Sequence, residues 1–358
     1  MLMLFDVSNI YYLPQFLPVI RELLVCDHDV KLVCYRNNIN PEFEPALDEA
    51  GVDRLWVNDD KEALKKFVEL APNWIFFANG FKHINQLALK TKTIQLGHGV
   101  GPKPSYYHKS STPMTVRFME GAMRLQKIKT LYPDDEFIQV GYSKLDPIVN
   151  GEEPGLDFQK IGLDSNKKTI LYAPTFNPSS LECFPDDWPK YFSGYNILIK
   201  PHTFTFTIDQ YKKQREKLIK WAKFDNTYVA SENNLSIVPF MKSADILLSE
   251  ASSTLFEFVA LNKPVIVCNF FKLKWSYRGP FHYRFVNRFG KDNVLYQGIG
   301  LHVNKFKELL TAIPQQLENP DQFSKNRKQY TFDHVGPTDG NASKRIVEWV
   351  ESYPKDKQ

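Results

Sequence analysis

Residues 244–257 read ADILLSEASSTLFE, and this stretch says most about the fold. Its first part, up to Leu248, has the length and apolar composition of a buried strand. A polar turn follows, and an apolar helical pattern begins at Thr254, so Ser252 or Ser253 is placed to cap a helix. Exposed amides and hydroxyls at such a helix start favour an anion, although most capped helices bind no ligand. Strand, turn and helix in this order indicate a parallel α/β sheet.

The same alternation of short apolar runs and helical patterns occurs along the rest of the chain. Strands are predicted at residues 1–7, 29–35, 54–57, 73–78 and 92–96, and again at 169–173, 196–200, 227–230, 244–248 and 264–268. Helices are predicted at residues 14–25, 41–50, 61–70, 156–164, 210–224, 235–242, 254–261, 304–316 and 342–352. The alternation predicts two successive parallel sheets with helices on both faces.

The length of 358 residues suits two domains better than one. The turn-rich sequence GEEPG at residues 151–155 predicts the boundary between them. We expect one Rossmann-like domain at residues 1–150 and a second at residues 151–330, with a helix in residues 331–358 that packs back on the first. The predicted fold class is therefore α/β, with two doubly wound domains facing a cleft and ligands at the carboxyl ends of the strands.

The composition excludes several classes of protein. A formal net charge of +4 is too small for a dedicated nucleic-acid binder. The four cysteines show no CxxC spacing, so neither a zinc site nor a disulfide framework is indicated. No apolar run has the roughly 18 residues that a membrane-spanning helix needs, and the N-terminus lacks the pattern of a signal peptide. We expect a cytoplasmic protein.

A second segment with chemical potential is LGHGVGPK at residues 96–103. Its glycines allow tight turns at the end of a predicted strand, beside His98 and Lys103. A histidine in that position suits a general base that faces a substrate. The alternative is a glycine-rich turn whose histidine only bonds locally.

Two further strands end in polar residues. ILIKPH at residues 197–202 ends with Lys200 and His202, a cation and a titrating group that together could meet a phosphate. LYAPTFNP at residues 171–178 runs from a strand into a loop rich in proline and threonine. A surface lysine beside a loop histidine, and an ordinary strand exit, are the simpler readings of these two segments.

Two stretches interleave basic and aromatic residues. Residues 270–291 hold six lysines and arginines, eight aromatic residues and no acid. Residues 101–129 hold six basic residues against Glu120 as the one acid. Those six are Lys103, Lys109, Arg117, Arg124, Lys127 and Lys129. Such surfaces suit an anionic acceptor, a nucleotide base or a membrane interface, and solvated cationic loops are the alternative.

Taken together, these segments resemble the CDP-glycerol glycerophosphotransferase family of teichoic-acid and capsule polymer enzymes, which have the GT-B fold. The matching segments are His98-Gly99-Val100 with Lys103, Ala173-Pro174-Thr175, Lys200-Pro201-His202, Ser249-Glu250-Ala251-Ser252-Ser253 with Glu257, Gly141 to Asp146, and Asp339-Gly340-Asn341-Ala342-Ser343. The likeness spans roughly residues 90–345. Val100 stands where the family has threonine, Glu250-Ala251 where it has Asp-Tyr, and Thr203 where proline is frequent.

The resemblance implies transfer of glycerol phosphate, or another polyol phosphate, from a CDP-activated donor to a hydroxyl of a cell-envelope glycan or polymer. The first domain would serve the acceptor and the second the donor. The implied catalytic residues are His98 as the base and His202 with Lys200 as stabilisers of phosphate charge. The implied donor residues are Ser252, Ser253 and Thr254 for the diphosphate, Glu257 for the ribose, and Pro174 and Thr175. Gly99, Lys103 and Arg278 are placed on the acceptor or phosphate side.

Other interpretations stay open at this point. A GT-B glycosyltransferase with a nucleotide-sugar donor would have the same architecture, as would a sugar epimerase. A nucleotide-binding protein of an envelope-assembly complex, without catalysis, is a third class. No metal site is indicated, and a bridging Mg²⁺ is left open. A lipid-linked acceptor would explain basic aromatic surfaces through peripheral contact with the inner face of the membrane.

Overall fold

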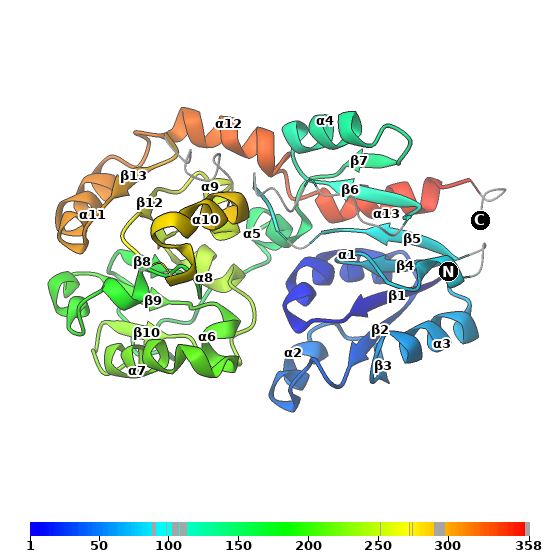
Figure 1. The fold of residues 1–358 in the computed structure, drawn as a ribbon, viewed down its shortest axis with the longest axis horizontal. Coiled ribbons are helices and arrows are strands. Elements are labelled where there is room, and N and C mark those ends of the chain that lie inside the picture. The colour runs from blue at the N-terminus through cyan, green and yellow to red at the C-terminus, as the bar shows by residue number, and fades with distance from the viewer. Residues whose placement is uncertain are drawn as a thin grey trace. The chain divides into compact units, whose positions relative to one another are not determined.

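The computed structural model describes residues 1–87, 91–97, 99–101, 107, 113–250, 252–271, 273, 275–289 and 298–354 (Figure 1). The chain divides into two compact units, which are treated separately below. Unit 1 comprises Met1–Gly99, Tyr107–Glu152 and Phe332–Gln358, and unit 2 comprises Val100–Tyr106 and Glu153–Thr331. Each unit is built on one sheet of parallel strands.

The sheet of unit 1 has the strand order β3-β2-β1-β4-β5-β6-β7. Its strands are β1 (Leu2–Val7), β2 (Asp29–Tyr35), β3 (Asp53–Val57), β4 (Trp74–Phe77), β5 (Lys92–Gln95), β6 (Val116–Met119) and β7 (Phe137–Gln139). Its helices are α1 (Leu13–Val25), α2 (Glu44–Asp48), α3 (Asp60–Leu70), α4 (Ala122–Leu131), α5 (Asp146–Val149) and α13 (Ala342–Ser352). This order is that of a doubly wound sheet, with its reversal between β1 and β4.

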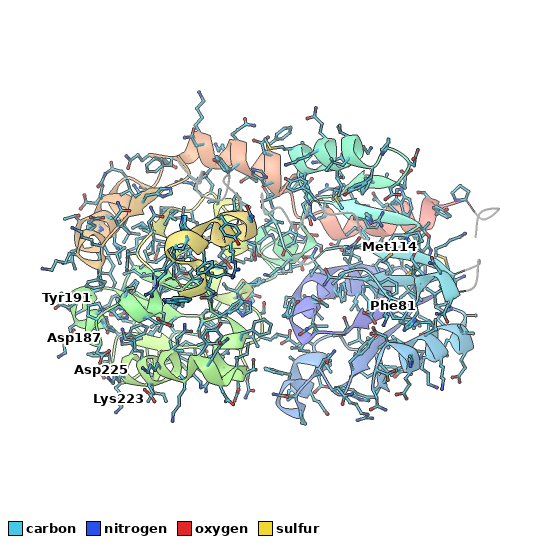
Figure 2. The ribbon with its side chains drawn as sticks, in the orientation of Figure 1. Phe81, Met114, Asp187, Tyr191, Lys223 and Asp225 are labelled. Atoms are coloured by element: carbon cyan, nitrogen blue, oxygen red, sulfur yellow. The ribbon has the colours of Figure 1, made fainter. Side chains whose placement is uncertain are left out.

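Apolar side chains cover both faces of this sheet. On one face Phe67 of α3 lies against Phe81, and Met114 packs on the same cluster (Figure 2). On the opposite face Phe16 of α1 meets Phe5 of β1, with ring centroids 5.1 Å apart. Helix α13 lies on the same face as α1, because its Trp349 ring packs edge-on against Trp74 of β4 and Phe118 of β6. The last helix of the chain therefore forms part of the core of unit 1.

The sheet of unit 2 has the order β10-β9-β8-β11-β12-β13. Its strands are β8 (Thr169–Tyr172), β9 (Asn196–Ile199), β10 (Thr227–Val229), β11 (Ile246–Ser249), β12 (Val265–Cys268) and β13 (Leu301–Val303). Its helices are α6 (Thr203–Thr207), α7 (Lys212–Trp221), α8 (Val238–Ser243), α9 (Ser253–Val259), α10 (His282–Phe289), α11 (Leu309–Glu318) and α12 (Ser324–His334), the last of which ends in unit 1. The order again reverses once, between β8 and β11.

One face of this second sheet carries an aromatic core. Tyr172 of β8 is stacked on Phe184, and Trp188 and Trp221 lie edge-on around them. Helices α7 and α11 supply the remaining side chains of this cluster. Helices α8 and α9 contact the strands with residues outside the cluster, so they cover the opposite face.

The predicted strands are confirmed, most of them nearly to the residue. The predicted helix at residues 156–164 is wrong, because this segment forms turns between Gly155 and Gly162, both with positive φ. Strands β6, β7 and β13 and helices α4, α5, α6, α10 and α12 were not predicted. Strand β6 was not predicted because Arg117 interrupts its short apolar run. Helix α12 was not predicted because it has no apolar stripe.

Two segments of the family pattern meet in unit 1 and hold helix α13. The carboxylate of Asp146 accepts hydrogen bonds from the backbone N–H of Ser343 at 2.7 Å, its hydroxyl at 2.6 Å, and the N–H of Ala342 at 3.3 Å. Asn341, at the helix start, provides no side-chain cap. Asp146, 196 positions before Ala342, caps the helix in its place. Burial raises the pKa of Asp146, and these hydrogen bonds oppose the rise. The segments around Asp146 and Ser343 therefore have a structural role.

We expect Asp146→Ala to destabilise unit 1 by about 2–4 kcal/mol, because it leaves three donors at a buried helix start without an acceptor. Hydrogen–deuterium exchange of residues 342–352 and urea unfolding would measure the effect. The matched control is Asp339→Ala, which removes a half-exposed partner of Arg345 and should cost about 1 kcal/mol or less. Equal effects of the two substitutions would contradict the capping role.

Candidate functional site

The site predicted in the second half of the chain lies where the strand order of unit 2 reverses. Strands β8 and β11 are neighbours, and their connections leave in opposite directions along the sheet. Thr175 follows β8 and Ser252 follows β11, both at carboxyl ends. Doubly wound sheets bind ligands at such a point, because loops from opposite sides of the sheet diverge there.

A buried carboxylate ties these two strand ends together. Glu250, which is 1% exposed, accepts hydrogen bonds from the N–H of Thr175 at 2.8 Å and the N–H of Ser180 at 2.5 Å, and also from the Ser180 hydroxyl. Next to it, the hydroxyl of Ser249 donates to the carbonyl of Ala173 at 2.7 Å. Burial raises the pKa of Glu250 to about 7, and the hydrogen bonds act against that rise. Glu250 therefore fixes the loop at residues 174–180.

Helix α9 begins with the predicted cap. Ser252 has extended backbone angles, and its hydroxyl oxygen accepts from the N–H of Thr254 at 3.3 Å. Ser252, Ser253 and Thr254 are partly exposed, whereas Glu257 is 2% exposed. The glycine-rich segment at residues 96–103 lies close to α9 at Gly101. A Cβ at Gly101 would lie 2.8 Å from the ring of Phe256 in α9, so only glycine fits there.

Lys200 and His202 follow β9, which pairs with β8. The N–H of Lys200 extends the ladder to the carbonyl of Tyr172 at 2.9 Å. His202 is exposed and caps helix α6, since its Nδ1 accepts from the N–H of Phe204 at 3.1 Å. A ring nitrogen that accepts carries no proton, so neutral His202 has its proton on Nε2. The ring also packs on Phe176, with centroids 4.7 Å apart.

In the basic aromatic stretch after β12, the described residues are exposed or half-buried. Trp275 is 77% and Tyr283 55% exposed. Arg284 lies over the ring of Phe281 at 4.8 Å. Arg278, also exposed, donates from Nε to the carbonyl of Leu273 at 2.6 Å.

The prediction of a basic surface at residues 101–129 is wrong for two of its cations. Arg117 is buried and pairs with Asp135 at 2.8 Å, and Arg124 is buried and pairs with Glu120. These arginines lie inside unit 1 because each has a carboxylate partner there.

The predicted residues His98 and Lys103 lie outside the described residues. Next to His98, the carbonyl of Gly99 accepts from Nη1 of Arg124 at 3.4 Å. The Oε1 atom of Glu120 lies 3.3 Å from where a Cβ of Gly97 would stand. The sequence analysis did not predict that Glu120 and Arg124 support the glycine-rich segment. The local signal for this pair is Glu120, the one acid of a basic stretch, four residues before Arg124.

A second polar cluster, also missed, lies at the carboxyl edge of the first sheet. The hydroxyl of Tyr35 donates to Oδ1 of buried Asp6 at 2.7 Å, and burial raises the pKa of Asp6 to about 7. After β4, the amide of Asn79 donates to the hydroxyl of Tyr12 at 2.5 Å. The local sequence does not show the partner of Asp6, because Tyr35 lies 29 positions away.

Among the described residues, no group of three His, Cys, Asp or Glu side chains could hold a metal ion. Within the same part of the chain, no helix has the length and apolar character needed to cross a membrane.

Comparison with known sequences identifies related proteins. A family model described as CDP-Glycerol:Poly(glycerophosphate) glycerophosphotransferase matches residues 126–352. The teichoic acid glycerol-phosphate primase of Bacillus spizizenii is 22% identical over 225 residues, which are 60% of this chain and 52% of that protein. The primase of the same name from Bacillus subtilis is 24% identical over 296 residues, 74% of this chain and 68% of that protein. The match thus spans about half the length of the first relative.

Solved structures show a similar fold. A variant of the wall teichoic acid polymerase TagF aligns with a TM-score of 0.70 at 15% identity, covering 100% of this chain and 89% of that chain. UDP-GlcNAc 2-epimerase from Neisseria meningitidis, bound to UDP-GlcNAc, aligns with a TM-score of 0.64 at 15% identity, and the alignment covers 98% of this chain and 100% of that chain. The predicted GT-B class, with two Rossmann-like parallel sheets, is confirmed. Because an epimerase scores almost as well, the fold alone does not choose the reaction.

The pKa of Glu250 makes the stability of unit 2 depend on pH. Between 4.5 and about 7 the unfolded chain ionises this carboxyl while the folded chain keeps its proton. We expect the free energy of unfolding of the wild type, relative to Glu250→Gln, to fall by about 3 kcal/mol from pH 4.5 to pH 8, with no further change above. Urea unfolding of both proteins at several pH values would measure the difference.

The control is Glu216→Gln, which replaces an exposed carboxyl on α7. Its effect on the free energy of unfolding should be small, because the side chain is exposed to water. A Glu250→Gln difference that is constant with pH would contradict the raised pKa.

Proposed function

Because the chain belongs to the CDP-glycerol:poly(glycerophosphate) glycerophosphotransferase family, we propose that it transfers glycerol phosphate from CDP-glycerol to a hydroxyl of a cell-envelope polymer. The observation that carries the proposal is the family match to residues 126–352. Its support in the fold is that three segments of the family pattern follow the adjacent strands β9, β8 and β11 of one sheet. They therefore share one sheet edge in unit 2.

On this proposal the donor lies at the end of β11. Ser252, Ser253 and Thr254 hold the diphosphate with their hydroxyls and the first amides of α9, while Glu257 binds the ribose. Pro174 and Thr175 form the facing wall. The hydrogen bond from Thr175 to Glu250 supports this arrangement, because it holds the two loops together before a ligand binds.

The reaction is an attack of the acceptor oxygen on the phosphorus that carries glycerol. One P–O bond forms, and the bond to the bridging oxygen breaks, so CMP leaves with the bonding electrons. His98 takes the proton of the acceptor hydroxyl. His202, through its Nε2 proton, and Lys200 stabilise charge on the phosphate oxygens, as phosphoryl transfer needs positioning and electrostatics above all. On this proposal, Gly99, Lys103 and Arg278 serve the acceptor or the phosphate.

We further place the enzyme on the inner face of the cell membrane, with a glycan or lipid-linked acceptor. Exposed Trp275 and Tyr283 beside Arg278 and Arg284 are the ring and cation combination that suits anionic headgroups. The four cysteines, Cys26, Cys34, Cys183 and Cys268, are free thiols, as in proteins of reducing compartments.

Calorimetric titration with CDP-glycerol, CDP, CDP-ribitol, UDP-GlcNAc and UDP tests the donor. We expect binding of the cytidine ligands and none of the uridine ligands. The double variant Ser252→Ala/Ser253→Ala should bind CDP at least about tenfold more weakly, because it loses the helix cap and two hydroxyls. The control is Lys223→Ala, an exposed residue at the rim of unit 2, which should bind like the wild type (Figure 2).

Transfer assays then separate the enzyme from a nucleotide-binding scaffold. His98→Ala should keep its affinity for CDP-glycerol and lose transfer by about 10²–10⁴-fold. Binding of uridine ligands alone would favour a glycosyltransferase. Folded protein that binds no nucleotide would refute the proposal.

Flotation with liposomes tests the membrane contact. We expect the wild type to float with anionic vesicles at physiological salt, and not with neutral ones, because the attraction is partly electrostatic. Trp275→Ala/Arg284→Ala should stay largely in the soluble fraction. If the wild type also remains there, the membrane contact is disproved.

A further inference from the structure

Unit 2 contains a cavity of about 210 Å³ beside the loop at residues 174–180. Phe176, Asn177 and Ser179 from that loop form one wall. The other walls come from Glu182, from Gln210 and Tyr211 before helix α7, and from Leu273 and Arg278 after β12. This volume is room for a small polar ligand.

The side chains of the cavity suit hydroxyl groups better than a phosphate. Arg278 and Glu182 bring one positive and one negative charge, so the described lining residues have no net charge to attract an anion. The amides of Asn177 and Gln210 and the hydroxyl of Ser179 both donate and accept hydrogen bonds. A hydroxyl also donates and accepts, whereas an ionised phosphate mainly accepts.

The walls are held in place without a ligand. The buried amide of Gln214 donates to the carbonyl of Phe176 and to the carboxylate of Glu182, each at 3.2 Å. Its own oxygen accepts from the hydroxyl of Thr205 at 3.3 Å. Gln214 thus joins two sides of the cavity to helices α6 and α7, and a pre-formed site costs less to occupy.

The cavity adjoins the proposed phosphate site. Phe176, on its wall, packs on the ring of His202 at 4.7 Å between centroids. Glu250 anchors both ends of the lining loop, at Thr175 and at Ser180. Phe176 therefore borders both His202 and the cavity, so a group esterified to a phosphate at His202 would lie one side chain away from the cavity.

We propose that the cavity binds the polyol of the CDP-activated donor, with Glu182, Asn177 and Gln210 as partners of its hydroxyls. This inference rests on the proposed function and deepens it, because it assigns a site for the transferred group apart from that for the nucleotide. The cavity then selects the donor by its polyol, while residues after β11 bind the diphosphate.

The test compares the affinities for CDP-glycerol and CDP in one calorimetric series. Glu182→Ala/Gln210→Ala should weaken CDP-glycerol binding about tenfold and leave CDP within about twofold, since only the first ligand reaches the cavity. Retained CDP affinity shows that the variant is folded. Gln210→Ala alone, at an exposed position, should change the ratio in the same direction. The control is Lys223→Ala, which should leave both affinities unchanged.

The outcomes distinguish this inference from the proposed function. A wild type that binds neither ligand refutes the proposed function, and the polyol site with it. A wild type that binds both, with a ratio of affinities unchanged in the variants, refutes the polyol site alone. An unchanged ratio with a raised KM for the acceptor assigns the cavity to the acceptor and likewise overturns the proposal.

Discussion

The candidate site depends on one buried carboxylate, that of Glu250. It receives hydrogen bonds from two points of a loop about 70 positions earlier in the chain and so joins the ends of β8 and β11. A buried carboxylate needs such partners, because an unsatisfied charge in the protein interior is costly. The same bonds place Thr175 beside the α9 start and set the wall that carries Phe176. The family pattern has aspartate at this position, so Glu250 differs from it in side-chain length. The carboxylate of Glu250 nevertheless holds the loops of the candidate site together.

The segments that resemble the family do not all serve the same purpose. Those after β8, β9 and β11 share one sheet edge, where a nucleotide would bind. Those around Asp146 and Ser343 bind each other and hold the last helix in the core of unit 1. Both kinds are short polar segments, so composition does not distinguish them. Only the partners of each side chain separate a structural motif from one that is available to a ligand.

Charge patterns were the least reliable guide to the surface. Arg117 and Arg124 belong to a basic stretch, but both are buried because Asp135 and Glu120 neutralise them. The stretch around Trp275 has the same basic and aromatic character and is exposed. The two differ in their acids, because the first stretch contains Glu120 and is followed by Asp135, 18 positions after Arg117, whereas residues 270–291 contain no acid.

The sequence by itself determined the two parallel sheets and most of their strands, because apolar runs of strand length recur between helical patterns and such periodicity is a local property. It also determined which polar segments end those strands, and hence the edge at which to look for a ligand. The tertiary structure alone decided that Glu250 joins the ends of β8 and β11, that Asp146 caps α13 and that a cavity lies beside Phe176. Each of these rests on contacts between residues far apart in the chain, and burial and hydrogen-bond partners arise only when those residues meet.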